Sequence, residues 1–334
     1  MAIVRVFVPT CGRPHLLRRA LNSLVAQTVS DWTAEVHNDL PDDETPLAIV
    51  AEFNDPRIKV VQHKTNLGGT ATFNLFFSKV AEPYYSILED DNWWEANFLE
   101  RLLAYFESHP TITVAWANQH IAEEQADGTW LETGRTVGPR KCGEPERLIH
   151  WPQIEQLYGA IHSQGAMMIR SRADDNFQTP DVDMVAMEGF RERCFPHPLL
   201  YVTEPLGWFA VTRHTYRTND SSKWVAIQAL LAASFLKYLS KELDLRAVWS
   251  KSRSSCPSMT PLLILIAIAH KNLRHHLKFV TASDCFRLAV TSAKHPNLAW
   301  AAMNAHKKHP GLWDFLCQTT SDRFAESRMY SATL

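Results

Sequence analysis

The first 110 residues alternate short β-branched runs with amphipathic segments, and this alternation restricts the possible folds more than any other feature of the chain. Ile3–Val8 is a continuous apolar run, as expected of a strand buried on both faces. Pro14 follows at a position that suits a helix start. Apolar residues then recur at helical spacing: Leu16, Leu17, Ala20, Leu21, Leu24 and Val25. Alternating strands and helices predict a parallel sheet with helices on both faces.

The same pattern continues to about residue 116 and then changes. Further strands are predicted at Ala34–His37, Ile58–Val61, Tyr84–Leu88 and Ile112–Trp116. Helices are predicted after Gly68-Gly69 and around Phe98–Phe106. Residues 117–150 favour a hairpin and loops, with a turn at Ala126-Asp127-Gly128. Beyond them we expect strands at Gln164–Ile169, Leu199–Thr203 and Trp208–Thr212, and a helix over 183–194.

After residue 221 no segment has a strand pattern. The segments that favour helices are Trp224–Leu239, Leu262–Lys278, Ser283–Thr291 and Leu298–Lys307. The charge changes at the same point. Residues 1–220 carry 19 Lys and Arg against 30 Asp and Glu, a net −11, whereas residues 221–334 carry 15 against 6, a net +9, which together give the formal −2. We therefore expect an acidic domain over 1–220 and a basic α-helical domain over 221–334.

Targeting signals are not apparent. The chain opens directly on a strand-like run, without the basic and apolar pattern of a secretory signal. The apolar run Pro261–Ala269 is too short to span a membrane, which takes about 20 residues. The six cysteines form no Cys-x-x-Cys pair and are expected to be free thiols. A cytoplasmic protein is expected.

The clearest chemical signal is the acidic turn Glu89-Asp90-Asp91, directly after the strand Tyr84–Leu88. Ligands of open α/β sheets bind outside the carboxyl ends of the strands. Adjacent carboxylates repel one another unless they share a cation, and Mg²⁺ or Mn²⁺ prefers such oxygens together with phosphate oxygens. The turn therefore fits a metal–diphosphate site. Taken alone, it fits equally well a solvated acidic turn that caps the next helix.

Other polar residues are expected at the same edge of the sheet, and together they resemble a known family. Each motif follows a predicted strand or helix in the expected order: Pro9, Thr10, Arg13 and Pro14; Gln27-Thr28; Asn38-Asp39; Asn66-Leu67-Gly68; Glu89-Asp90-Asp91. This combination resembles glycosyltransferase family 2, well over about residues 3–110 and loosely over 160–215. The resemblance implies an α/β GT-A fold with a Rossmann-like, mostly parallel sheet flanked by helices. It divides the first domain into a nucleotide-sugar-binding half (1–110) and an acceptor half (111–220), with the C-terminal α-helical appendage outside it.

The resemblance also implies an inverting transfer of sugar from a nucleotide-sugar donor, UDP- or dTDP-linked, to a hydroxyl acceptor. Asp39 would bind the nucleobase, with the Pro9–Arg13 loop around it. Asp91 would be the main ligand of Mg²⁺ or Mn²⁺, and Asp90 would contact the ribose or the metal. The implied donor-binding set is Pro9, Thr10, Arg13, Asp39, Asn66, Gly68, Asp90 and Trp93, and the implied metal ligands are Asp91, Glu89 and His214.

The sequence departs from the family pattern at two positions. Asn38 stands where an acid is usual, and Phe73 stands where an arginine is often found. The diphosphate would then depend on the metal and on Arg or His side chains from elsewhere, such as Arg213 or Arg217. Of the paired tryptophans, we expect Trp93 or Trp94 to stack on a sugar and the other to lie in the core.

The general base of the family usually opens a helix in the acceptor half. Asp183 is the first choice here and Asp181 the second, with Glu188 a further alternative. A carboxylate at this position could equally be only a helix N-cap. His214 follows a predicted strand and could be a metal or phosphate contact, or an ordinary surface residue.

The basic segment Lys271–Lys278 lies outside the resemblance. It could be a solvated face, could bind a lipid-linked or anionic glycan acceptor or an anionic membrane surface peripherally, or could pack against an acidic neighbour in an oligomer. Nucleic acid is not expected as a partner, since no recognition module accompanies the charge.

Two other functions compete with glycosyl transfer. A nucleotidyltransferase would use the same acidic metal chemistry, but it usually has a glycine-rich loop after the first strand, whereas Cys11-Gly12-Arg13 offers one glycine. A non-catalytic carbohydrate- or partner-binding module on a degenerate GT-A fold would tolerate the departures at Asn38 and Phe73.

Overall fold

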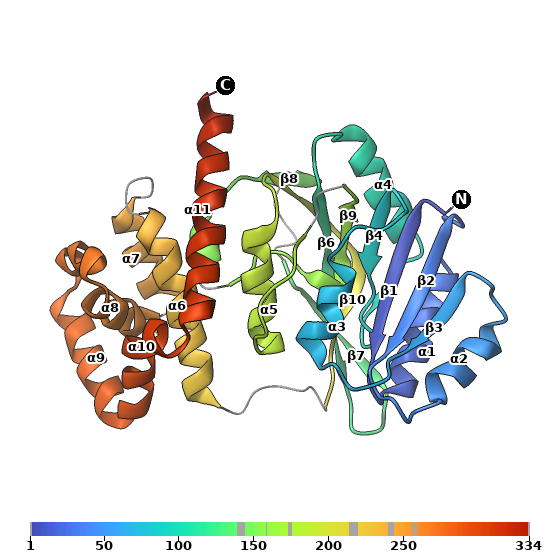
Figure 1. The fold of residues 1–334 in the computed structure, drawn as a ribbon, viewed down its shortest axis with the longest axis horizontal. Helices are drawn as coiled ribbons and strands as arrows, with labels where there is room; N and C mark the ends of the chain where they lie inside the picture. Colours follow the sequence, from blue (N-terminus) through green and yellow to red (C-terminus); the bar gives the residue numbers. More distant parts are fainter. Residues whose placement is uncertain are drawn as a thin grey trace. The chain divides into compact units, whose positions relative to one another are not determined.

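The computed structural model describes residues 2–138, 144–157, 159–172, 176–213, 220–239, 244–255, 257 and 259–332. Their strands form one ten-stranded sheet in the order β3-β2-β1-β4-β9-β6-β10-β5, with β7 paired to β6 and β8 to β10. Figure 1 shows this sheet with helices packed beside it. The predicted α/β class is thereby confirmed, with a parallel half that comes first in the chain.

The parallel half contains β1 (Val4–Thr10), β2 (Trp32–Asn38), β3 (Ile58–Gln62) and β4 (Tyr84–Ile87). Its first connection is α1 (Pro14–Val25), which begins at a proline as expected. The others are α2 (Thr45–Phe53) and α3 (Gly69–Phe76). Register pairs the last residue of β1, Thr10, with Asn38 at the end of β2. The carboxyl ends of β1, β2 and β4 therefore meet at one edge.

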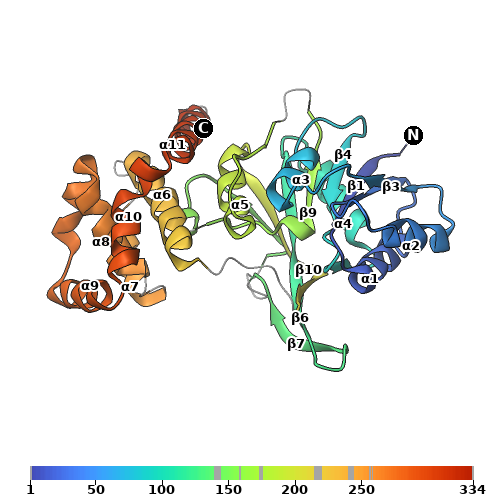
Figure 2. The same cartoon turned by 60° about the horizontal axis from the view of Figure 1, so that its bottom comes forward.

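The second half of the sheet mixes directions. It contains β5 (Trp93–Trp94), β6 (Val114–Glu124), β7 (Trp130–Thr136), β8 (Glu146–Ile149), β9 (Met167–Arg170) and β10 (Leu199–Val211), with α4 (Phe98–Ser108) before β6. Figure 2 shows the predicted hairpin, β6–β7, extending beyond the rest of the sheet. The prediction of two separate strands over 199–212 is wrong. One strand spans the region, with register shifts around Pro205, which lacks an amide donor.

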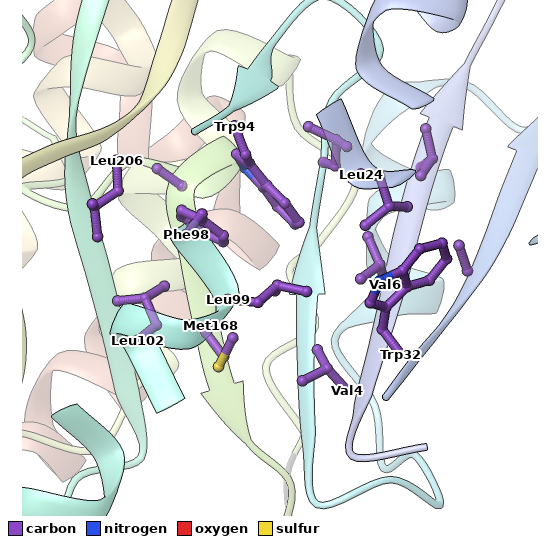
Figure 3. Packing of buried hydrophobic residues seen from close by; sticks show 14 of the residues in the cluster. Val4, Val6, Leu24, Trp32, Trp94, Phe98, Leu99, Leu102, Met168 and Leu206 are labelled. Carbon is purple, nitrogen blue, oxygen red and sulfur yellow. The ribbon is translucent and has the colours of Figure 1, made fainter. Parts of the chain in front are cut away.

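The core of the sheet domain lies between the parallel strands and the helices α1 and α4. Leu17, Leu21 and Leu24 of α1 are wholly buried, as their spacing predicts. They share one apolar cluster with Trp32 of β2 and with buried side chains of α4, part of which Figure 3 shows. Burial of each large apolar side chain stabilises the fold by about 1.5–3 kcal/mol. This packing holds the strand ends rigidly where the site is built.

Residue contacts divide the chain into two compact units. The first comprises residues 1–150, 162–181 and 195–216, and contains the sheet. The second comprises 151–161, 182–194 and 217–334, so it includes α5 (Met184–Arg191) as well as the C-terminal helices. The division of the chain into domains over 1–220 and 221–334 stays a prediction.

The C-terminal helices of the second unit are α6 (Ser221–Leu239), α7 (Leu245–Ser255), α8 (Met259–Ala269), α9 (Ala282–Lys294), α10 (Pro296–Lys308) and α11 (Pro310–Ala332). The sequence pattern did not predict α7 or α11. A single helix over Leu262–Lys278 was wrong, because His270 has extended backbone that ends α8. A 3₁₀ helix, η4 (Lys271–Phe279), follows. None of the described helices is both long and apolar enough to cross a membrane.

One buried histidine should make the second unit sensitive to acid. His276 of η4 is 1% exposed, and burial lowers its pKa from 6.5 to about 4, helped by the neighbouring His275 and Lys278. The unfolded chain binds the proton more readily, so stability present above pH 6.5 should be lost as the pH falls towards 4. Up to about 3 kcal/mol is at stake. Urea unfolding at several pH values should show this loss, reduced in His276→Leu but not in the exposed-site control His295→Leu.

Candidate active site

Three strand ends meet at the polar edge of the sheet. The Asp39 amide, just after β2, donates to the Thr10 carbonyl oxygen at the end of β1 (3.0 Å). The Thr10 hydroxyl in turn donates to Asp90 Oδ2, just after β4 (2.8 Å). We call Thr10, Arg13, Asp39, Asp90 and Asp91 the acidic rim. The sequence assigned all five to one edge, and the structure brings them together there.

Arg13 joins the two aspartates of the acidic turn. Its guanidinium donates to Asp90 through Nε and Nη2, and to Asp91 Oδ2 through Nη1 (2.8 Å). The resemblance assigned Arg13 to the loop around the nucleobase. The geometry gives its side chain a contact with the acidic turn instead, where it offsets the repulsion between neighbouring carboxylates.

Asp90 is completely buried, so the acidic turn is not a solvated helix cap. The following helix, α4, begins after Asn97, and no side chain caps it. Burial raises the pKa of Asp90 to about 7, while Arg13 and Thr10 oppose that shift. Asp91 differs, since its side chain keeps 20% of its surface exposed. Asp90 is thus the structural member of the pair, and Asp91 is the one that a ligand can reach.

Asp39 organises the loop before α3. Its Oδ1 accepts hydrogen bonds from the Leu67 amide (2.7 Å) and His63 Nδ1 (3.0 Å), and its Oδ2 accepts one from the Gly68 amide (2.9 Å). Asn66 Nδ2 donates to the Asp39 carbonyl oxygen (2.8 Å). This explains physically why Asn66 and Gly68 accompany Asp39 in the sequence. Gly68 adopts φ of 80°, a conformation that favours glycine.

A row of polar groups that no sequence motif indicates lies behind Asp39. His63 Nε2 lies 3.1 Å from His37 Nδ1, and His37 Nε2 lies 3.4 Å from Glu35 Oε2. Burial lowers the pKa of His37. Glu35 and His37 are alternate residues of β2, and Asp39 follows two residues later just after its end, so all three side chains point to the same side of the sheet. The row fixes the orientation of the Asp39 carboxylate.

The acidic rim fits a divalent cation only together with its substrate. Within the described ranges, no three His, Cys, Asp or Glu side chains converge on a metal-binding position. Asp91 is the most exposed carboxylate of the rim, with 20% of its side-chain surface accessible against 8% for Asp39 and none for Asp90. Mg²⁺ typically takes one or two carboxylates plus substrate phosphates and water, so this donor set fits a cation brought in with a diphosphate. His214, the third predicted ligand, lies outside the described residues.

Glu89 faces a different neighbour. Its Oε2 accepts a hydrogen bond from Asn92 Nδ2 (2.7 Å), and Asn92 Oδ1 accepts one from the Ala210 amide of β10 (3.0 Å). Gly165 packs directly against this pair. A Cβ on Gly165 would lie 2.5 Å from both Glu89 Oε2 and Asn92 Nδ2. The missing side chain of Gly165 therefore leaves the space in which Asn92 links Glu89 of the acidic turn to β10.

Gly165→Ala should disrupt that junction. Because the added methyl group must displace Glu89 and the buried Asn92, we expect a loss of about 1–3 kcal/mol in the free energy of unfolding. We also expect impaired ligand binding at the acidic turn. Thermal unfolding and nucleotide binding would be measured together. Gly128→Ala loses left-handed freedom in an open turn and serves as the comparison, since it should leave binding unchanged. Wild-type stability and binding in Gly165→Ala would contradict the expectation.

Next to the acidic turn, Arg19 lies between the rings of Trp93 and Trp130, an aromatic clamp that the sequence did not predict. The Arg19 guanidinium lies 3.9 Å from the Trp93 ring centre and 3.8 Å from that of Trp130. Arg19 Nη2 also donates to the Asp91 carbonyl oxygen (2.6 Å). Trp93 stacks on Trp208, with ring centres 5.3 Å apart, so it is largely engaged by protein. Trp94 is a core residue, 3% exposed.

This clamp brings a second positive charge to the turn. Burial lowers the pKa of Arg19 to about 10, still far above neutrality, so it stays charged. Arg13 and Arg19 thus supply the cations that Phe73 does not. The sequence could not predict this role. Arg19 shows only the spacing of a surface residue of α1, and its partner Trp130 is more than a hundred residues away in the chain. Arg213 makes its hydrogen bonds elsewhere. Its amide donates to Glu124 Oε2 (3.0 Å), and its Nη1 donates to the Ala126 carbonyl oxygen (3.3 Å).

The two candidate bases fall in different units. Asp181 is exposed and belongs to the first unit. Asp183 belongs to the second, where it is the N-cap of α5 and its Oδ1 accepts from the Val185 amide (3.1 Å). The capping role is therefore real, and it leaves the other carboxylate oxygen of Asp183 available. A catalytic role for either residue stays a prediction.

Solved structures share this architecture. S. aureus TarS 1–349 in complex with UDP matches with a TM-score of 0.57 at 15% identity, over 93% of this chain and 92% of that one. The same protein in complex with UDP-GlcNAc matches with a TM-score of 0.58 at 14% identity over the same shares. At these identities the likeness shows the fold. That fold, with a polar edge at the carboxyl ends of β1, β2 and β4, defines a GT-A type domain.

Residues 5–164 match the model of glycosyl transferase family 2. WcaA of Escherichia coli K12, provisionally named a colanic acid biosynthesis glycosyl transferase, is 27% identical over 36% of this chain and 44% of its own. WfgD of Escherichia coli, a UDP-Glc:alpha-D-GlcNAc-diphosphoundecaprenol beta-1,3-glucosyltransferase, is 24% identical over 42% and 52%. The chain spans about half the length of these curated relatives.

Proposed function

We propose that the protein is an inverting, metal-dependent glycosyltransferase that moves a sugar from UDP or dTDP to a hydroxyl acceptor. This proposal rests on the different environments of Asp90 and Asp91 in the acidic rim. Asp90 is buried against Thr10 and Arg13, while Asp91 keeps an accessible carboxylate. Arg13 bonds the Asp91 carboxylate and Arg19 bonds its backbone carbonyl, so the turn presents one carboxylate suited to a cation beside positive charge suited to a diphosphate.

The nucleobase is expected at Asp39. A carboxylate can accept about four hydrogen bonds, and Asp39 accepts three from His63, Leu67 and Gly68. One acceptor position on Oδ2 is left for the imide N–H of uracil or thymine. UDP in the TarS structure and UDP-Glc in the name of WfgD support a uridine donor.

Asp91 would hold Mg²⁺ or Mn²⁺, with phosphate oxygens of the donor completing its coordination. The bound cation would supply charge stabilisation of the departing diphosphate, worth several kcal/mol. Arg13 and Arg19 keep the turn folded against the repulsion of its own carboxylates and add positive charge beside it. Glu89 would stabilise the turn through Asn92 rather than bind the donor.

Asp183 would act as the general base, with Asp181 the alternative. Its carboxylate would take the proton of the acceptor hydroxyl as that oxygen bonds to the anomeric carbon. The bond from the anomeric carbon to the diphosphate oxygen breaks at the same time, and the nucleoside diphosphate leaves with the electron pair. In-line displacement inverts the anomeric centre. The acceptor would be a glycan, a lipid-linked sugar or a small molecule, and the diphosphoundecaprenol-linked GlcNAc in the name of WfgD supports the lipid-linked class.

A donor screen tests this function. The full chain would be incubated with UDP-, dTDP- and GDP-sugars in Mn²⁺ or in EDTA, and release of nucleoside diphosphate would be followed. We expect Mn²⁺-dependent release from UDP- or dTDP-sugars. A parallel incubation would contain a nucleoside triphosphate and a sugar phosphate. Release of pyrophosphate there would instead identify a nucleotidyltransferase. Binding without turnover of any donor would identify a non-catalytic module.

A further inference from the structure

Helix α9 (Ala282–Lys294) turns its apolar side to the outside of the second unit. Five residues that recur at i, i+4 spacing lie along one side of it: Cys285, Phe286, Ala289, Val290 and Ala293. All five are exposed, and Phe286 and Val290 keep 72% and 37% of their surface. The one residue of the helix that is buried is Asp284. This is the reverse of the usual arrangement of a surface helix.

An ion pair fixes the helix in this orientation. Asp284 Oδ2 accepts hydrogen bonds from Arg253 Nη2 of α7 (2.8 Å) and from the Thr281 hydroxyl (2.8 Å). The Thr281 amide also donates to it (2.9 Å), which completes a capping box. Asp284 is 3% exposed, whereas the Arg253 side chain keeps 32% of its surface, so the carboxylate is buried and the guanidinium lies nearer the surface. The polar side of α9 is therefore anchored to its unit, and the apolar side is left facing outward.

The C-terminal helical segment that presents this face is rich in basic residues. Residues 221–334 carry 15 Lys and Arg against 6 Asp and Glu. The 3₁₀ helix η4, which packs on α8 as α9 does, exposes Lys271, Arg274 and Lys278. Trp300 of the adjoining α10 is 53% exposed, with Lys308 Nζ 4.0 Å from its ring centre. The second unit as a whole carries 18 Lys and Arg against 11 Asp and Glu, so a second copy would bring a like net charge of +7 against the face, which disfavours self-association through it.

We infer that the exposed face of α9 is a docking surface for an anionic lipid bilayer. Phe286 and Val290 enter the boundary between headgroups and acyl chains, while the surrounding Lys and Arg side chains contact anionic headgroups. Amphipathic helices with apolar residues on one side and basic neighbours bind membranes in this way. The inference concerns the second unit alone. It does not depend on the proposed sugar transfer.

Vesicle sedimentation tests the inference with the full chain. Large vesicles of phosphatidylcholine with about one-third phosphatidylglycerol would be compared with vesicles of phosphatidylcholine alone. We expect binding to the anionic vesicles that weakens with added salt. Phe286→Ser with Val290→Ser should lower the bound-to-free ratio at least about 10-fold, since both side chains lose their apolar contact with lipid. Leu131→Ser, on an exposed side chain of β7, is the matched control and should bind like wild type.

The change lies on the surface, so the double variant should fold, which circular dichroism would verify. Equal vesicle binding by wild type and the double variant would overturn the inference, as would absent binding by wild type. A dimer in light scattering that the double variant abolishes would assign the face to a second copy and would equally overturn it. A protein that binds vesicles yet transfers no sugar would leave the inference standing and count against the proposed function.

Discussion

Asp91→Asn should lower the rate of sugar transfer by at least about 10³-fold while the protein stays folded. Asp91 is the most exposed carboxylate of the acidic rim, and asparagine is a poorer ligand for Mg²⁺ or Mn²⁺ because it has no charge. Arg13 keeps its bonds to the buried Asp90, so the turn should retain its conformation. Initial rates at saturating donor and Mn²⁺ would measure the loss.

The exposed Asp314 of α11 provides the matched control, since Asp314→Asn makes the same chemical change away from the rim. Its transfer rate should equal that of wild type. A transfer rate in Asp91→Asn within a few-fold of wild type would remove Asp91 from the metal site. A loss of fold in Asp91→Asn would be seen by thermal unfolding and would be separated from a loss of chemistry.

Asp183→Asn should reduce transfer about 10²–10⁴-fold without weakening donor binding. The substitution is informative because asparagine is as good an N-cap as aspartate, so α5 should keep its hydrogen bond from the Val185 amide. What asparagine cannot do is take a proton from the acceptor hydroxyl. Asp183→Ala should lose the cap as well, with a further cost of about 1 kcal/mol in stability. Transfer rates, donor affinity and thermal unfolding would be measured on both variants.

The two candidate bases can be separated in one experiment. If Asp183 is the base, Asp181→Asn should retain most of its activity. Full activity in Asp183→Asn together with loss in Asp181→Asn would move the base to Asp181. Full activity in both would show that neither residue deprotonates the acceptor, and Asp183 would then be a cap alone.

The parallel half of the sheet could be predicted because its signals are local. The run before Thr10 and the helical spacing after Pro14 depend on residues within one or two turns of each other. The edge of the sheet was predictable for a related reason, since the carboxyl ends of neighbouring parallel strands must meet. That placed Thr10, Asp39 and Asp90 together before any contact was known.

The rest depends on long-range packing. Nothing near Arg19 in the sequence indicates that it lies between Trp93 and Trp130, because the β6–β7 hairpin supplies one ring and β5 supplies the other. The pairing of His37 with His63 likewise joins two separate strands. The sequence predicts a helix over Ser283–Thr291 but not which of its sides faces outward, because that depends on the contact of Asp284 with Arg253 of another helix.

Calorimetric titration of UDP and dTDP into the wild-type protein, in Mn²⁺ and in EDTA, tests most directly whether the acidic rim is a donor site. We predict saturable binding of at least one nucleotide that Mn²⁺ tightens about 10-fold or more, with the Mn²⁺ effect lost in Asp91→Asn. Binding of neither nucleotide, or binding of equal strength in wild type and Asp91→Asn in the presence of Mn²⁺, would contradict the account.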